Sequence, residues 1–410
     1  MKRLGMILMA GVMVLGFTQC KKEQAPANTE TEGVHITLTV DGGSNSSKVA
    51  VNPNASEGYA TVAFETGDII YVGNNGAYCG YLTHNGTNFS GTVTPTSEAD
   101  YLHFYFMGNK GPADSEPTSV SITDQTGKYP VISYAHSTVL YNSGVNTYSA
   151  KLQNYCSIVK FTTNSIPTAT AVTVKGMKNT VSVNFGANNA AASTPTLGNN
   201  PYTPGQSGDG DIILHAESTT ERWAILLEQD EASGATVTAS GYNNSTCNVP
   251  KISNNTYNNS GVGIAMTTTI TWNSSTVNGI KISNSSFTNS GIKVTSNSSN
   301  AKWNYSSISS IDLKNTSDKL TFSTADGTIK KIVITLDSSS GSVDGTLSSG
   351  WSYVGLPYFT LTWTDDSSSS VDLSGDSSKA APGGTGGIIG PVTSVLKVSA
   401  ITKVEFTVLK

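Results

Sequence analysis

Charged side chains are scarce in this chain of 410 residues, because Asp, Glu, Lys and Arg together make up only 13% of it. The formal net charge is −5, and the only arginines are Arg3 and Arg222. A protein that binds nucleic acid, or that is held on anionic lipid by charge alone, needs a dense field of basic side chains. The composition therefore predicts no nucleic-acid partner.

Cysteine is also rare, with Cys20, Cys79, Cys156 and Cys247 as the complete set. Cys20 belongs to the N-terminal leader, so three cysteines remain for the folded part. An odd number cannot form a fully paired disulfide framework. Either one bridge forms or all three thiols are free and buried, and the sequence leaves both outcomes open. Stability is expected to come mainly from sheet packing.

Long apolar runs are absent except for residues 4–17. This run is too short to cross a hydrocarbon core of about 30 Å as a finished helix. It follows Lys2 and Arg3 and ends at Cys20, which is the pattern of an export signal. We expect a lipoprotein whose mature N-terminus is a lipidated Cys20. An ordinary cleaved signal peptide with an incidental cysteine is the alternative.

Helical periodicity is absent after the leader, whereas short alternating segments rich in Val, Ile, Tyr and Phe recur between Gly, Asn, Asp and Pro. Residues 34–40 alternate strictly. Such segments at intervals of roughly 8–12 residues are typical of antiparallel β-sandwiches. The sequence predicts an all-β protein with a signal peptide at residues 1–20, a tether at 21–33, and three β-sandwich domains at 34–165, 166–268 and 269–410.

Several segments resemble the fimbrillin-like lipoproteins of Bacteroidetes. They are Phe-Glu-Thr-Gly-Asp-Ile-Ile-Tyr-Val at residues 64–72, Leu-His-Phe-Tyr-Phe at 102–106, Leu-Gln-Asn-Tyr-Cys-Ser-Ile-Val-Lys-Phe at 152–161, and Arg-Trp-Ala-Ile-Leu-Leu at 222–227. The resemblance covers roughly residues 1–268. It implies two transthyretin-like sandwiches, an outer-membrane lipoprotein exposed on the cell surface, and assembly with other pilus subunits into fimbriae. Residues 269–410 resemble no family that we recognise.

The resemblance further implies assembly by strand exchange. A protease that cuts after Arg or Lys removes the lipidated leader and the first strand, and the vacated groove accepts a strand from another subunit. The matching first strand carries Val34, Ile36, Leu38 and Val40 on one face, and Lys48 is the candidate processing site. Alternation of Val404, Phe406 and Val408 fits a donated strand. The alternatives are a permanent first strand, a solvated loop lysine, and a C-terminal strand that pairs within its own domain.

Catalytic and metal-binding motifs are missing. The chain has no G-x-S-x-G, no H-E-x-x-H and no C-x-x-C, and its five histidines are scattered through strand and turn patterns. Acidic clusters at residues 209–211 and 365–376 lack the spacing of a calcium-binding loop, and turn capping accounts for them. We expect no catalytic residue, no metal ion and no cofactor.

Four aromatic residues near turns in the last third, Trp303, Trp351, Tyr353 and Tyr358, are candidates for stacking on sugar rings, with core packing as the alternative for each. Trp363 continues an alternating strand and is predicted to be core. The expected function is a non-catalytic surface adhesin or pilus subunit at a tip or accessory position, which binds a host or bacterial surface ligand such as a glycan. The alternative is a resident glycan-binding lipoprotein of a polysaccharide uptake system.

Overall fold

The computed structural model describes residues 33–40, 50–54, 59–108, 111–112, 114–127, 129–185, 201–205, 210–254, 256–277, 279–305, 309–355, 357–375 and 396–410. Side chains of residues 50–63, 257, 259, 366 and 367 lie outside the description. All regular elements of the described chain are strands, joined by turns and irregular segments, so it holds no helix long and apolar enough to span a membrane. The predicted all-β class is confirmed.

An eight-stranded sheet forms the first part of the molecule. Its order is β10 (Thr147–Ala150), β1 (Val34–Val40), β6 (Phe89–Val93), β5 (Ala77–His84), β4 (Ile69–Asn74), β7 (Tyr101–Met107), β9 (Ile132–Leu140) and β11 (Gln153–Asn154). The pairs are antiparallel except that β1 runs parallel to β10. Alternation of apolar and polar residues places one face of β1 in the core, whereas β4 and β7 are buried on both faces.

Smaller sheets form the second part. One contains β17 (His215–Ala216), β18 (Glu221–Leu226), β12 (Ser157–Thr163) and β21 (Thr256–Ile264), with β12 parallel to β21. Another contains β16 (Gly210–Ile213), β13 (Val172–Met177), β19 (Ala232–Ala239) and β20 (Ser245–Val249). The remaining two sheets contain β15 (Tyr202–Pro204), β14 (Thr180–Val183) and β8 (Ser119–Ser121), and the hairpin of β2 (Ala50–Asn54) and β3 (Tyr59–Ala63).

These first two parts share one hydrophobic core, because the buried residues from Ile36 to Met266 form a single cluster. Strand β8 pairs with β14 across the sequence, and the hydroxyl of Tyr202 donates to the carbonyls of Phe106 and Ser133. The domain boundaries near residues 165 and 268 stay predictions. Pairing of β12 with β18 and β21 favours placing the first boundary before Ser157.

The third part is a sandwich with its own core, which extends from Trp272 to Val408. Its larger sheet has the order β23 (Ile280–Ser283), β26 (Ala301–Tyr305), β27 (Ser309–Leu313), β34 (Leu396–Leu409), β29 (Thr328–Leu336), β32 (Thr360–Ser368) and β31 (Trp351–Val354), and β22 (Thr267–Asn273) and β30 (Ser342–Gly345) also pair with β34. The smaller sheet contains β24 (Ser286–Asn289), β25 (Ile292–Ser296), β28 (Lys319–Thr324) and β33 (Ser370–Ser374).

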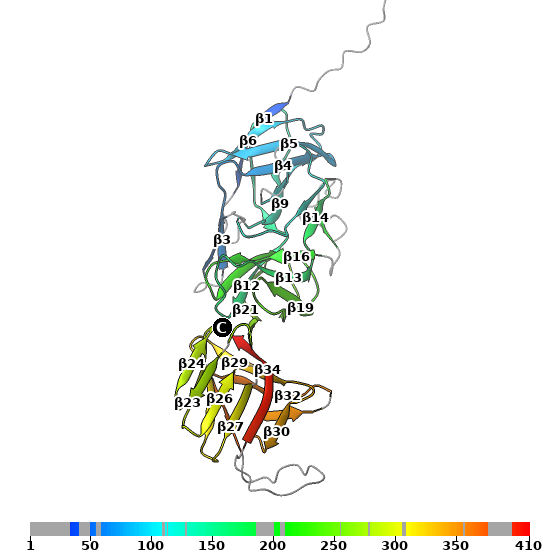
Figure 1. Cartoon of the computed structure of the whole chain (residues 1–410). Helices are drawn as coiled ribbons and strands as arrows, with labels where there is room; N and C mark the ends of the chain where they lie inside the picture. The colour runs from blue at the N-terminus through cyan, green and yellow to red at the C-terminus, as the bar shows by residue number, and fades with distance from the viewer. Residues whose placement is uncertain are drawn as a thin grey trace, which may run out of the picture.

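The molecule is elongated, with β1 near one end and the third sandwich at the other (Figure 1). Two residues, Ala265 and Met266, separate β21 from β22. The side chain of Asn164 bonds both the N–H and the carbonyl of Met266, at 2.8 and 2.9 Å. Asn243 donates to the hydroxyls of Thr267 and Thr269. These bonds fix the orientation of the third sandwich on the second part.

All three cysteines of the described chain are free and buried, which decides between the two outcomes that the sequence left open. Burial raises the pKa of the Cys79 and Cys156 thiols to about 12 and that of Cys247 to about 11. The thiolate is the reactive form of cysteine, so these thiols are structural and chemically inert.

Candidate functional site

The first candidate site is the position of β1 in the eight-stranded sheet. β1 lies between β6 and β10, one strand in from the sheet edge. Ile36 is paired with Gly91, and Leu38 with Phe89 on one side and Tyr148 on the other. Both side chains are fully buried, whereas Val34 and Val40 are half-buried. The predicted strand and its core-facing side are therefore confirmed, and their exchange remains a prediction.

Few specific contacts hold β1 beyond its backbone ladders. Thr39 donates its hydroxyl to the side-chain oxygen of Asn88 at 3.2 Å, and the Thr37 N–H bonds the carbonyl of Asn146 at 2.7 Å. Within the described chain, no ion pair involves a β1 residue. Another extended strand with alternating apolar residues could therefore replace β1, since it would form the same backbone bonds and bury two similar aliphatic side chains.

The predicted lipidation site Cys20 and processing site Lys48 lie outside the described residues. Lys48 belongs to residues 41–49, which connect β1 to β2 in the sequence. A cut after Lys48 would therefore separate all of β1 from the rest of the chain.

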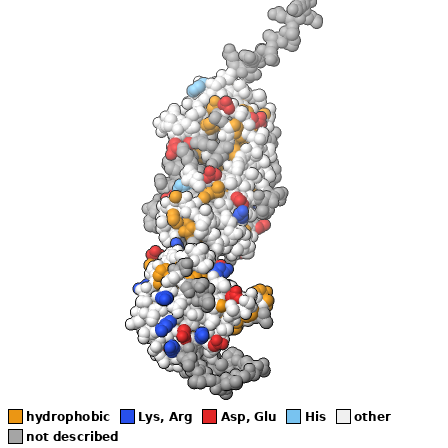
Figure 2. Space-filling model, viewed as in Figure 1, with side chains coloured by type: hydrophobic (Ala, Val, Ile, Leu, Met, Phe, Trp, Pro, Cys, Tyr) orange, Lys and Arg blue, Asp and Glu red, His pale blue; other side chains and the backbone are white. Residues whose placement is uncertain are grey.

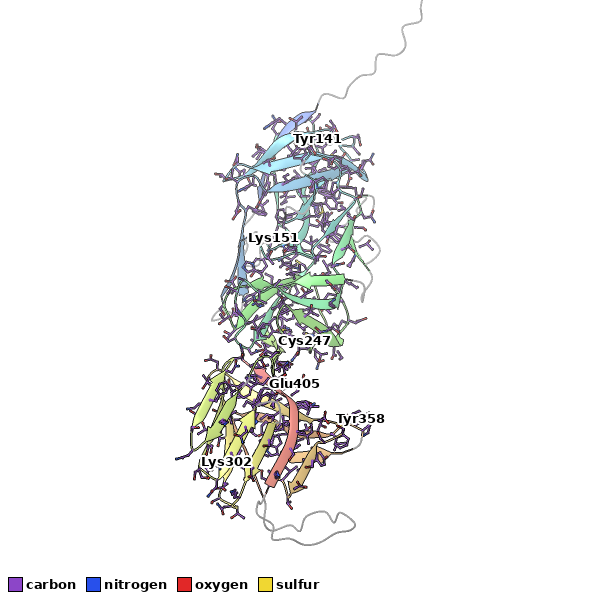
Figure 3. All side chains as sticks on the ribbon, viewed as in Figure 1. Tyr141, Lys151, Cys247, Lys302, Tyr358 and Glu405 are labelled. Carbon is purple, nitrogen blue, oxygen red and sulfur yellow. The ribbon has the colours of Figure 1, made fainter. Side chains whose placement is uncertain are left out.

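Val404, Phe406 and Val408 pair within their own domain, which favours the alternative to a donated strand. They lie in β34, which pairs with β22 along one edge and with β29 along the other over these same residues. All three side chains are buried. The C-terminus lies at the junction of the second and third parts, and Figure 3 shows Glu405 beside it. β34 is the central strand of its own sandwich, as the alternative interpretation held.

For two of the four candidate glycan contacts, Trp303 and Trp351, burial favours the alternative of core packing. Trp303 is 2% exposed, and its ring lies 5.9 Å from that of Trp272 and 5.8 Å from that of Phe322. Trp351 is 8% exposed and donates its indole N–H to the carbonyl of Asp372 at 2.8 Å. Rings covered by the facing sheet cannot stack on a sugar. The prediction that Trp363 is core is confirmed.

Tyr353 and Tyr358 remain as surface aromatics, with exposed fractions of 37% and 70%. Tyr353 lies on β31, which pairs only with β32 among the described strands, and Tyr358 lies in the following turn. Val354 between them in sequence is exposed as well. Figure 3 places Tyr358 on the projecting flank of the third sandwich, where Figure 2 shows hydrophobic side chains at the surface.

Two buried polar groups were not anticipated from the sequence. The guanidinium of Arg222 is fully buried and donates to the carbonyls of Pro167 at 3.0 Å and Ile166 at 3.3 Å, and desolvation lowers its pKa. His103 contacts the Tyr134 hydroxyl at 2.7 Å and the Asp100 carboxylate at 3.2 Å. Burial lowers the pKa of His103 against the pull of Asp100. Alternation alone cannot reveal either group, because it does not show what covers a strand.

The His103 cluster resembles a catalytic arrangement only in composition, because His103 and Asp100 are both buried at 5% exposure. Its hydrogen bonds join neighbouring strands and turns of the first sheet. In the described residues, no group of three or more His, Cys, Asp or Glu side chains is placed to hold a metal ion. Turn geometry explains several of the acidic residues, as where Asp337 accepts the N–H groups of Ser339 and Ser340.

No family model and no curated protein matches the chain. Among solved structures, it is similar to a candidate cell adhesion protein of Bacteroides ovatus, with 13% identity over 58% of this chain and 96% of that one and a TM-score of 0.33. A candidate cell adhesion protein of Bacteroides uniformis shows 14% identity over 51% and 80%, with a TM-score of 0.31. The fimbrial anchor protein of Porphyromonas gingivalis shows 12% identity over 50% and 77%, with a TM-score of 0.23.

Proposed function

We propose that this chain is a non-catalytic pilus subunit and adhesin of the bacterial surface, whose β1 is replaced by a strand from another subunit. The observation that carries the proposal is the position of β1. It fills an interior place in the sheet through backbone bonds and two buried aliphatic side chains, and the connecting segment after it contains Lys48. The sequence resemblance to fimbrillin-like lipoproteins supports the same mechanism.

In this proposal the chain accepts a strand and gives none, so it ends the polymer at a tip. The support is the pairing of β34 on both edges, which leaves the C-terminal strand unable to leave without dismantling its own sandwich. The vacated place would lie near one end of the molecule and the third sandwich at the opposite end (Figure 1). Such a subunit would attach through its first sheet and carry the third sandwich outward.

The lipid on Cys20 would then be a temporary anchor at the outer membrane. It would hold the exported subunit until cleavage after Lys48 removes the leader together with β1. Removal would leave β6 and β10 with unpaired backbone groups and would leave the core positions of Ile36 and Leu38 empty. An incoming strand would pair these backbone groups and fill both positions with its own side chains.

Substitution Lys48→Gln tests this proposal. We expect the variant to keep its leader, to remain in the membrane fraction and to be absent from purified pili, because no basic residue is left in the connecting segment. Lys151→Gln, which changes an exposed lysine of the described chain, serves as the control and should be processed normally. N-terminal sequencing and pilus fractionation give the readout. A Lys48→Gln protein that enters pili as well as the control does would contradict the proposal.

A second candidate function is a resident glycan-binding lipoprotein, and the exposure of Tyr353 and Tyr358 favours it. Replacing both tyrosines by alanine should weaken glycan binding about tenfold or more, since each stacking ring contributes on the order of 1 kcal/mol. The matched double phenylalanine variant keeps both rings and should bind nearly as the natural protein does. A glycan array measures this. Equal binding by the alanine and natural proteins would exclude these tyrosines as the contact.

A further inference from the structure

A polar pocket of about 370 Å³ lies on the second part of the molecule, between the start of β12, the segment that joins β20 to β21, and the first residues of β21. Its volume falls in the lower range of small-molecule sites, roughly 300–1,000 Å³. Six of its seven lining residues carry hydroxyl, amide or ammonium groups: the lining is Ser157, Lys251, Ile252, Ser253, Thr256, Asn258 and Ser260.

Hydrogen bonds within the wall hold part of this lining in place. The Thr256 hydroxyl lies 2.7 Å from the Ser157 hydroxyl, which in turn donates to the Thr256 carbonyl at 2.9 Å. The N–H and the hydroxyl of Ser260 both donate to the side-chain oxygen of Asn258, at 3.2 and 2.7 Å. Because two donors fix that oxygen, the NH₂ group of Asn258 is the part of the amide left for another partner.

The groups left available are donors. Within the described chain, the Lys251 ammonium, the Asn258 NH₂ and the Ser253 hydroxyl make no side-chain hydrogen bond or ion pair. None of the described lining residues carries a carboxylate, and the neighbouring Glu228 accepts from the side chain of Asn254 at 2.9 Å. One exposed ammonium group beside neutral donors matches a singly charged carboxylate, whereas phosphate sites often add an arginine or a cluster of backbone N–H groups.

We propose that this pocket binds a carboxylate-bearing sugar. Lys251 and Asn258 hold the carboxylate, and the Ser253 hydroxyl bonds a ring hydroxyl or its acetamido group. Ile252 is 2% exposed and packs into the core, so the surface offered to a ligand consists mainly of hydroxyl, amide and ammonium groups, which suits a polar sugar ring. This site lies on a different part of the chain from β1 and from Tyr358, so it extends the adhesin role and does not depend on strand exchange.

The test uses the purified full chain and calorimetric titration with glucuronic acid, N-acetylneuraminic acid, glucose, acetate and inorganic phosphate. We expect one of the two acidic sugars to bind, and glucose and acetate to bind at least about tenfold more weakly. Added salt should lower the affinity for the acidic sugar, because it screens the attraction between the carboxylate and Lys251. Lys251→Gln should lower affinity about tenfold or more, and Asn258→Ala several-fold.

Lys293→Gln is the matched control, because it removes an exposed lysine from β25 of the third sandwich and should leave binding unchanged. Lys251 is itself exposed, so its variant should keep the melting temperature of the natural protein. The proposal is overturned if neither acidic sugar binds, if phosphate or acetate binds as tightly as the acidic sugar, or if Lys251→Gln binds it as the natural protein does.

Discussion

Leu38→Asp should lower the free energy of unfolding by about 4 kcal/mol or more and release β1 from its sheet. The Leu38 side chain is fully buried in the hydrophobic core, and its backbone pairs with β6 on one side and β10 on the other. The variant loses the transfer free energy of a leucine and must place a carboxylate in an apolar core, or else expel the strand. Urea unfolding measures the loss, and limited proteolysis of residues 34–40 reports the release.

Thr39→Asp is the matched control for this prediction. Thr39 is the next residue of β1 and is exposed on the opposite face. The same charge there should change the free energy of unfolding by about 1 kcal/mol or less, because only the exposed hydroxyl bond to Asn88 is lost. Equal stability of the two variants would show that β1 does not occupy the described place. If only the Leu38 variant loses much of its free energy of unfolding, Leu38 fills a core position that the strand of another subunit would have to fill after exchange.

Trp303→Ala should destabilise the third sandwich by about 3–5 kcal/mol, because removing a buried aromatic side chain leaves a cavity. Trp303 packs between Trp272 and Phe322, and its ring also lies 6.1 Å from that of Tyr305. Thermal unfolding followed by tryptophan fluorescence should show that this sandwich unfolds at a lower temperature than in the natural protein. The third part and the first two parts have separate hydrophobic cores, so the unfolding temperature of the first two parts should not change.

Tyr358→Ala is the control for the tryptophan variant, since its side chain is exposed and should contribute little to stability. The two variants separate packing from ligand contact. A Trp303→Ala protein with unchanged stability and lost glycan binding would contradict the assignment of this tryptophan to the core.

The parts of the fold that local pattern decides were predictable. β1 was expected at residues 34–40 and occupies Val34–Val40, with Ile36 and Leu38 inward. Partner choice was not predictable, because alternation shows that a strand has an apolar face and says nothing about its neighbours. The parallel pairs of β1 with β10 and β12 with β21, and the pairing of β8 with β14, join strands far apart in the sequence.

The burial of two tryptophans and the presence of the pocket could not be read from the sequence, for related reasons. Trp303 and Trp351 are close to turns in the sequence, but closeness to a turn does not show whether a facing sheet covers the ring. The polar pocket brings Ser157 next to Lys251, Thr256 and Asn258, so the hydrogen bond between Ser157 and Thr256 spans a sequence separation of 99 residues. Apart from the abundance of Ser, Thr and Asn, no sequence signal brings these residues together.

The most direct test of the proposed function is the N-terminal sequence of the protein recovered from purified pili and from the outer membrane of the same cells. Cleavage after Lys48 predicts that the pilus form begins at Val49 and lacks Val34–Val40, while the membrane form begins at Cys20. A pilus form that retains β1, or a protein found only in the membrane with Cys20 at its start, would contradict strand exchange in this chain.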